Sequence, residues 1–162
     1  MAKRPTRAKK AAQPATKPKP KERRRLGRVL VINTGNTSSK LAIFEDEKPV
    51  KEENLACTPP EGSKRVIEEL PGRTAQVRGF LKAIGVEVRE LAAVVARGGL
   101  LAPLPAGVFR VNDRMLDDLR GAKYGDHASN LSAPIAAELV SGTGIDAFIV
   151  DPVTVDEFPA VA

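Results

Sequence analysis

One short polar segment carries the residue types that bind phosphate. It spans residues 33–40 (NTGNTSSK) and lies between two apolar runs. Gly35 permits a positive φ, so consecutive backbone N–H groups can converge on an anion. Thr37, Ser38 and Ser39 add hydroxyl donors, and Lys40 adds a fixed positive charge. The segment is not a P-loop, because no Gly-x-x-x-x-Gly-Lys occurs. Taken alone, it is slightly more typical of an ordinary hairpin turn.

Three further residues lie where ligand-binding groups occur, and each also has a purely structural explanation. Arg97 precedes two glycines, where a guanidinium can hold a carboxylate or phosphate or simply cover a turn. Asp151 ends the last apolar run, where it can hold a metal-bound phosphate, orient a nucleophile or begin a turn. His127, the one histidine, can donate to a phosphoryl group or be an exposed residue near a helix cap. A metal site built from several histidines is therefore excluded.

The elements that position these residues follow from hydrophobic spacing. Short apolar runs predict strands, and recurrence at i, i+3, i+4 and i+7 from Val77 predicts a helix closed by Gly85. The expected strands cover residues 29–32, 41–44, 50–57, 91–95 and 147–150. The expected helices cover residues 66–70 (ended by Pro71-Gly72), 73–84, a segment capped by Asp113, and 130–140. Strands followed by alternating helices and strands imply a layered α/β domain.

Charge divides the chain into a tail and a body. Residues 1–28 hold 12 basic residues and one acid, a net charge of +11, whereas residues 29–162 carry −5. Residues 1–27 have low complexity, so we predict a disordered basic tail before a domain over residues 28–162. A simple solvated tail is favoured over a polyanion-binding arm, because nothing in the body supports a nucleic-acid role. Only 4% of residues are aromatic, which argues against a base-stacking surface.

Two classes of protein are excluded on other grounds. No uncharged apolar run reaches the roughly 18 residues of a membrane-spanning helix, so we expect no membrane association. A single cysteine, Cys57, excludes an internal disulfide and a cysteine-rich zinc site. It fits a reducing, cytoplasmic location.

Considered together, five ordered segments resemble the butyrate kinases of the acetokinase family. The resemblance covers residues 28–162, and two of its segments favour the butyrate branch over acetate kinase itself: HASN at 127–130 and VDPV at 150–153. The five segments are 29–40 (VLVINTGNTSSK), 44–47 (FEDE), 94–101 (VVARGGLL), 127–131 (HASNL) and 148–153 (FIVDPV).

This resemblance implies an actin-like ATPase fold of the ribonuclease H-like class, in which two α/β domains flank a cleft. It also implies Mg²⁺-dependent phosphoryl transfer from ATP to a short-chain fatty acid such as butanoate, in a homo-oligomeric cytoplasmic enzyme. By resemblance, the phosphate-binding residues would be Asn33, Gly35, Thr37, Ser38, Lys40 and Asn130. The catalytic residues would be Arg97, His127 and Asp151, and the metal would be held by Asp151 and Asn33.

The sequence departs from the family pattern in detail and in extent. Thr34 and Asn36 replace the usual Pro and Ser of the first loop, and Ala96 stands where a Gly commonly precedes the arginine. The second half of the family fold, with its adenosine pocket, has no counterpart here. We therefore expect a fragment with little activity alone, completed by a missing half on a second chain.

Two other functions stay open at this stage. One is a nucleic-acid-associated protein that acts through the basic tail, with a degenerate kinase body. The other is a sugar kinase, which is less favoured because such enzymes usually begin with Asp where Asn33 stands. The kinase hypothesis also expects Lys40 and Asp151 to line a single pocket.

Overall fold

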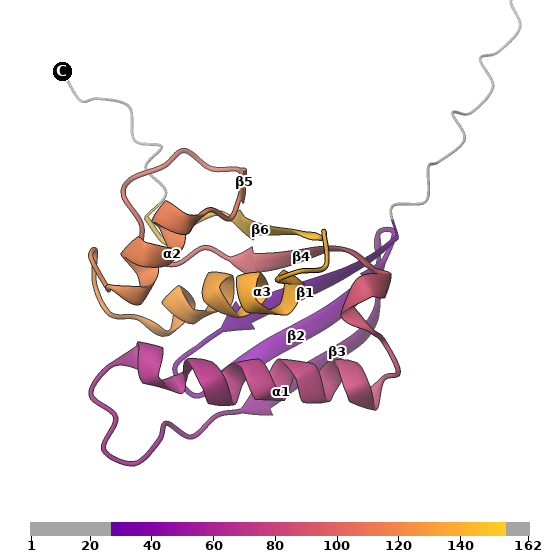
Figure 1. Cartoon of the computed structure of the whole chain (residues 1–162), viewed down its shortest axis with the longest axis horizontal. Coiled ribbons are helices and arrows are strands. Elements are labelled where there is room, and N and C mark those ends of the chain that lie inside the picture. The colour runs from indigo at the N-terminus through magenta and orange to yellow at the C-terminus, as the bar shows by residue number, and fades with distance from the viewer. Residues whose placement is uncertain (1–26, 155–162) are drawn as a thin grey trace, which may run out of the picture.

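A single six-stranded mixed sheet organises the molecule (Figure 1). The computed structural model describes residues 27–154, so almost all of the predicted basic tail lies outside the described residues. The strands are β1 (Arg28–Thr34), β2 (Ser38–Glu45), β3 (Lys48–Ala56), β4 (Leu91–Arg97), β5 (Val108–Arg110) and β6 (Asp146–Val150). Their order across the sheet is β3-β2-β1-β4-β6-β5.

Strand direction places several loops at one end of this sheet. β1, β2 and β3 form an antiparallel meander, while β4 and β6 run parallel to β1, and β5 returns antiparallel beside β6. The carboxyl ends of β1, β4 and β6 therefore share one edge with the start of β2. We call this the carboxyl edge; it is where open α/β sheets bind ligands.

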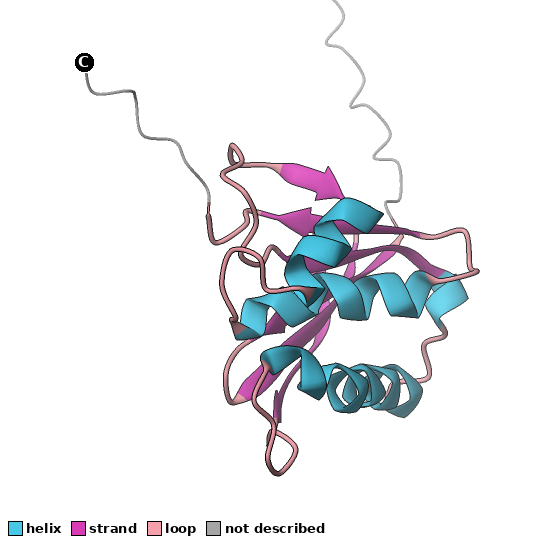
Figure 2. Ribbon diagram, turned by 60° about the vertical axis from the view of Figure 1, so that its left-hand side comes forward, coloured by secondary structure: helices cyan, strands magenta, loops and turns pink. Residues whose placement is uncertain are grey.

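The helices cover one face of the sheet. Figures 1 and 2 show α1 (Leu70–Ala83) and α3 (Ser132–Val140) lying side by side across it, with α2 (Asp113–Arg120) near the carboxyl edge. Three short 3-10 turns complete the connections: η1 (Val66–Glu69), η2 (Val88–Glu90) and η3 (Ala128–Leu131). No described helix is long and apolar enough to cross a membrane.

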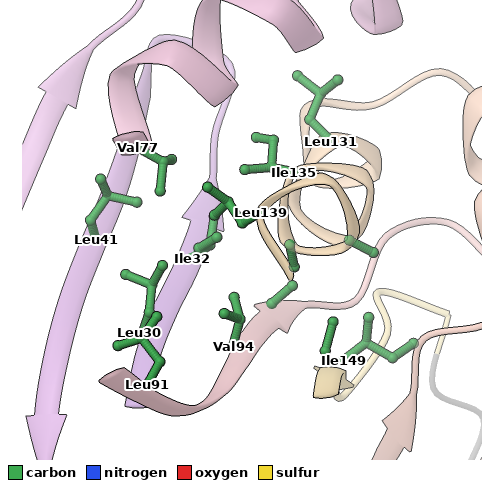
Figure 3. Close-up of a cluster of buried hydrophobic side chains, with 14 of the residues drawn as sticks. Leu30, Ile32, Leu41, Val77, Leu91, Val94, Leu131, Ile135, Leu139 and Ile149 are labelled. Carbon is green, nitrogen blue, oxygen red and sulfur yellow. The ribbon is translucent and has the colours of Figure 1, made fainter. Parts of the chain in front are cut away.

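Alternation along the strands separates a packed face from an open one. Leu30, Ile32 and Val94 are fully buried against Ile135 and Leu139 of α3, as Figure 3 shows. Their neighbours along each strand point the other way, and no helix of the described region covers them. We call that surface the open face. It consists of Val29, Val31, Asn33, Lys40, Ala42, Phe44, Ala93, Val95, Arg97, Phe148 and Val150, all half-buried or exposed.

Most predicted elements are confirmed, with three corrections. Pro71 does not stop a helix: it occupies the first turn of α1, where a missing N–H costs nothing. The cap of α2 is Asn112 rather than Asp113, because the Asn112 side chain accepts the Met115 amide at 3.0 Å. Strand β5 was not predicted, since three residues are too few to show alternation.

Candidate functional site

Three predicted site residues form a row across adjacent strands on the open face. Lys40 of β2 pairs directly with Asn33 of β1, and Ile32 pairs with Ala96 of β4. Continuing that register by one residue places Arg97 beside Asn33. Two cationic side chains thus flank an amide at the carboxyl edge, with neighbouring strands about 4.8 Å apart. We call Lys40, Asn33 and Arg97 the polar row.

The turn before Lys40 is a compact hairpin and differs from the predicted phosphate loop at Gly35, which has no positive φ and uses its amide inside the turn. The Gly35 amide donates to the Ser38 carbonyl at 2.8 Å, and the Thr37 carbonyl accepts the Cys57 amide at 2.9 Å. Thr37 is exposed, and Ser38 is half-buried. These contacts hold residues 35–38 as a short link between β1 and β2, which confirms the hairpin. Phosphate binding by this turn stays a prediction.

Sequence reasoning missed the side chain that supports this turn, Arg73. Its guanidinium, 2% exposed, donates to the carbonyls of Asn36 and Ser38 at 3.3 and 3.2 Å. It also donates twice to the Glu69 carboxylate, at 2.9 and 2.7 Å. The only sequence signal is an i, i+4 acid–base pair inside an amphipathic helix, which normally indicates an exposed ion pair.

The segment around His127 is tied to the end of β1. Thr34 donates through its hydroxyl to the Ala128 carbonyl at 2.6 Å, and its amide donates to the Ser132 hydroxyl at 3.1 Å. His127 itself is exposed, and its Nδ1 accepts the Ser129 amide at 3.2 Å. Nδ1 also lies 2.8 Å from the Ser129 hydroxyl, so Ser129 engages this side of the ring and Nε2 is the nitrogen that faces away from these contacts.

Asn130 is buried, and both polar atoms of its side chain bind the backbone of neighbouring loops. It is 2% exposed; its Oδ1 accepts the Leu100 amide at 2.9 Å, and its Nδ2 donates to the Gly125 carbonyl at 2.8 Å. A Cβ added to Gly99 would lie 2.8 Å from that Oδ1. The structure thus gives Asn130 a positioning role between two loops, and direct phosphate contact stays a prediction.

Asp151 closes the same edge in a strained backbone conformation. Its φ is 40°, a left-handed value rare for residues other than glycine. Asp151 and Gly107 exchange two hydrogen bonds: the Gly107 amide donates to Oδ1 at 3.0 Å, and the Asp151 amide donates to the Gly107 carbonyl at 3.1 Å. Strain of this kind clusters at functional sites.

The loop that follows Arg97 packs too closely for any side chain at its first glycine. The Gly98 amide donates to the Val150 carbonyl at 3.0 Å, and a Cβ on Gly98 would lie 2.5 Å from Pro152 Cα. Only glycine permits the backbone of residue 98 to lie this close to Pro152, and this holds whether or not the site binds a ligand. The pair of glycines after Arg97 is therefore explained by packing against β6 and the Asn130 loop.

These contacts join four loops into one edge. Thr34 links the β1 turn to the His127 segment, Asn130 links that segment to the Gly99 loop, and Gly98 links this loop to the end of β6. The predicted site residues come from chain segments that are far apart in the sequence, and the structure places these segments along this one edge.

An open-face cavity of about 440 Å³ adjoins the polar row. Asn33 and Lys40 line it together with the apolar side chains of Val31, Ala42 and Phe44. The lining residues from β3 are polar: Glu52, Glu53 and Asn54. Asp151 does not line this cavity. It follows β6, three strands from β2, so the two residues are separated by about 14 Å of sheet. A single pocket for Lys40 and Asp151 stays a prediction.

Two cations away from the polar row have shifted pKa values. A hydrogen bond to Asp118 at 3.0 Å, followed by contact with Tyr124, raises the pKa of Lys123. The hydrogen bond to Glu45 raises the pKa of Arg28 at the opposite end of β1. Both side chains have local acidic partners, whereas Lys40 and Arg97 form no ion pair within residues 27–154. Two carboxylates, Glu52 and Glu53, nevertheless line the cavity beside Lys40.

The donors at the carboxyl edge suit a magnesium ion that also binds phosphate. Mg²⁺ in phosphoryl-transfer sites uses one or two carboxylates and takes its other ligands from phosphate and water. Asp151 provides one carboxylate with an oxygen beyond the one that accepts Gly107. No group of three or more His, Cys, Asp or Glu residues forms a metal cage within residues 27–154. Asn33, the other predicted metal ligand, lies on β1, two strands or about 10 Å of sheet from β6, so one ion shared by Asn33 and Asp151 stays a prediction.

Two solved structures share part of their fold with this chain. No protein-family model matches the chain. The crystal structure of acetate kinase from Porphyromonas gingivalis matches with a TM-score of 0.52 and 14% identity, covering 76% of this chain and 37% of that one. Acetate kinase from Entamoeba histolytica matches with a TM-score of 0.50 and 14% identity, covering 76% of this chain and 34% of that one. The chain therefore spans well under half the length of either enzyme. At this identity the likeness is one of fold, and the described domain has the actin-like α/β fold found in part of these acetate kinases.

Proposed function

We propose that this chain supplies the carboxylate- and phosphate-binding part of a carboxylate kinase. The reaction would transfer the γ-phosphoryl group of ATP to a short-chain fatty acid, giving an acyl phosphate and ADP. The observation that carries this proposal is the polar row of Lys40, Asn33 and Arg97 on three adjacent strands. The acetate kinase fold and the five-segment resemblance to butyrate kinases support it.

The polar row has the chemistry that phosphoryl transfer requires. The transferred group carries negative charge spread over its oxygens, and catalysis comes mainly from positioning and electrostatic stabilisation. Lys40 offers a point charge and Arg97 a planar fork that matches a carboxylate or phosphate. Asn33 between them adds an amide donor. This arrangement would hold an acyl phosphate without a covalent intermediate on the protein.

An apolar row beneath the polar row supports a short alkyl substrate. Val31 pairs with Ala42 on one side and with Val95 on the other, and Val95 pairs with Phe148. Residues two apart on a strand advance about 6.6 Å, comparable with the extended length of butanoate. A carboxylate at the polar row would thus place its alkyl chain on these side chains. We infer butanoate as the preferred acid on this basis and on the sequence resemblance.

His127 and Asp151 would act from the same edge. The Nε2–H of His127 would donate to a phosphoryl oxygen, because its Nδ1 is already an acceptor for Ser129. Asp151 would hold Mg²⁺, which neutralises phosphate charge when bound. Gly107 fixes the orientation of the Asp151 carboxylate through their paired hydrogen bonds.

Turnover would need residues beyond those described. The two acetate kinases are much longer than the region they share with this chain. We propose that an adenosine site comes from the remaining part of such a fold, on whichever polypeptide carries it. Butanoate, ATP and Mg²⁺ with this chain alone would then yield little acyl phosphate when trapped as hydroxamate. Robust turnover would contradict the need for a second half.

A binding experiment tests the site directly. Butyryl phosphate is titrated into the ¹⁵N-labelled full chain, and amide shifts are followed by NMR. We expect saturable shifts at Asn33, Lys40, Arg97 and His127, and their loss in the Lys40→Gln/Arg97→Gln double variant. Matched changes at Lys51 and Arg78, which lie outside the row, would leave binding intact. Shifts confined to residues 1–26 would instead favour an anion-binding tail and would overturn the proposed site.

A further inference from the structure

Arg73 is a buried cation that contacts the phosphate turn without facing the ligand. It lies on α1, on the packed face of the sheet, whereas the polar row lies on the open face. A guanidinium buried to this degree needs a partner charge and filled hydrogen bonds. Glu69, one turn earlier and 11% exposed, supplies the charge at 2.7 Å.

The guanidinium is used as a two-sided fork. One side, Nε and Nη2, binds the Glu69 carboxylate at 2.9 and 2.7 Å. The other side binds the turn: Nη2 donates to the Asn36 carbonyl at 3.3 Å, and Nη1 donates to the Ser38 carbonyl at 3.2 Å and the Ser39 hydroxyl at 3.3 Å. Lysine has no planar fork and cannot reproduce this set of contacts.

These contacts decide which groups of the turn face outward. In a trans peptide the C=O and N–H point in opposite directions. Since the Asn36 carbonyl points to Arg73, the Thr37 amide in the same peptide points away from α1. Ser39 is buried on the packed face. Successive residues of a strand face opposite sides, so anchoring Ser39 directs Lys40 to the open face.

We propose that Arg73, held by Glu69, is a positioning residue that sets the turn at residues 35–39 for phosphate binding. The proposal rests on the proposed function of the polar row. Arg73 touches neither the phosphate nor the carboxylate: it acts through the backbone of Asn36 and Ser38. Its effect depends on the fork geometry as well as on the charge.

The experiment compares Arg73→Lys with Arg78→Lys in the full chain. Both substitutions keep the charge on α1, but Arg78 is exposed and donates to the Glu138 carbonyl, away from the turn. Three quantities are measured: the unfolding midpoint, the butyryl phosphate Kd, and hydrogen exchange of the Gly35 and Cys57 amides. These two amides donate within or to the turn, at 2.8 and 2.9 Å, and report its conformation without any ligand.

We expect Arg73→Lys to weaken butyryl phosphate binding by about tenfold or more in the folded protein, because several charge-assisted hydrogen bonds are lost. Exchange at Gly35 and Cys57 would accelerate, while the Val94 amide at the sheet centre keeps its protection. Arg78→Lys would change neither the Kd nor the exchange rates. A purely structural role would lower the unfolding midpoint but leave the Kd of the folded protein unchanged, and that result would overturn the proposal.

Two further results separate this proposal from the function on which it rests. If butyryl phosphate causes no shifts at the polar row of the wild-type chain, the proposed function fails. Unchanged exchange at Gly35 and Cys57 in Arg73→Lys refutes the positioning role on its own. If Arg73→Lys does not fold, Glu69→Gln replaces it, since it removes the charge that holds the guanidinium and keeps Arg73. A Kd and exchange rates equal to wild type in Glu69→Gln would then overturn the proposal.

Discussion

The side-chain oxygen of Asn130 accepts the backbone amide of Leu100 at 2.9 Å, across 30 residues of sequence. The same side chain donates to the Gly125 carbonyl at 2.8 Å, so one buried amide joins the loop after β4 to the loop before η3. His127 lies in one of these loops, and Arg97 immediately precedes the other. Their separation at the carboxyl edge is therefore set by Asn130.

Asn130→Ala should destabilise the protein by about 1–3 kcal/mol, because the Leu100 amide and the Gly125 carbonyl lose a buried partner. Urea unfolding of the full chain, monitored by circular dichroism, measures this change. Asn54→Ala, on the exposed strand β3, is the matched control and should fall within about 0.5 kcal/mol of wild type. Equal stability of the two variants would show that Asn130 does not join the loops.

Gly98→Ala should displace the loop after Arg97, because the new Cβ would lie 2.5 Å from Pro152 Cα. We expect lower stability and weaker butyryl phosphate binding together. Gly79→Ala on α1 meets no atom within 4 Å and should stabilise the chain by about 0.5–1 kcal/mol. Thermal unfolding of both variants tests this contrast, and a stabilised Gly98→Ala protein would refute the packing argument.

Lys40→Gln and Arg97→Gln should each weaken butyryl phosphate binding by about tenfold or more, through loss of a charge-assisted hydrogen bond. Both side chains are exposed, so the free energy of unfolding should hardly change. Isothermal calorimetry at two salt concentrations measures the affinity and its screening. Retained affinity in both variants would exclude the polar row as the anion site.

Val95→Phe should make the chain bind acyl phosphates with shorter acyl groups in preference to butyryl phosphate. The larger ring would cover the apolar row beneath Asn33 and Arg97, where we place the alkyl group. The ratio of acetyl to butyryl phosphate affinity should rise by about tenfold, the scale on which apolar pockets discriminate by size. Ala137→Val on α3, outside the open face, serves as the control. An unchanged ratio in Val95→Phe would place the alkyl chain elsewhere.

Asp151→Asn should separate the structural and ionic roles of this residue. Asparagine also tolerates a positive φ, and its oxygen can still accept the Gly107 amide, so stability should stay within about 0.5 kcal/mol of wild type. The carboxylate charge is lost, so added Mg²⁺ should no longer strengthen butyryl phosphate binding. The wild-type chain should show that strengthening in the same titration. Equal Mg²⁺ dependence in both proteins would remove Asp151 from the metal site.

The sequence predicts the sheet better than the site. The continuous apolar run at residues 29–32 identifies a central strand. Such a run is typical of a strand buried on both faces, whereas Val29 and Val31 lie half-buried on the open face. Helix α1 also follows from spacing, although its start is misplaced because Pro71 suits a first turn as well as a stop.

Tertiary contacts explain what the sequence left out. Nothing local indicates that Asn130 holds two loops together, because its partner, the Leu100 amide, is 30 residues away. The same holds for Arg73, whose partners in the turn are 34 to 37 residues away. The polar row could not be predicted, because it depends on how β1 pairs with β4, and this pairing cannot be deduced from the spacing of residues along the sequence.

The hydrogen bond between the Thr34 amide and the Ser132 hydroxyl spans 98 residues. Closing so long a loop has an entropic cost that only the completed parallel pairing of β1, β4 and β6 can offset. A partly folded chain would contain the β1–β2 hairpin without the His127 segment and the loop after Arg97. Anion binding at this edge should therefore be lost in the same cooperative transition that unfolds the sheet, and the measured affinity would report whether the native strand pairing is present.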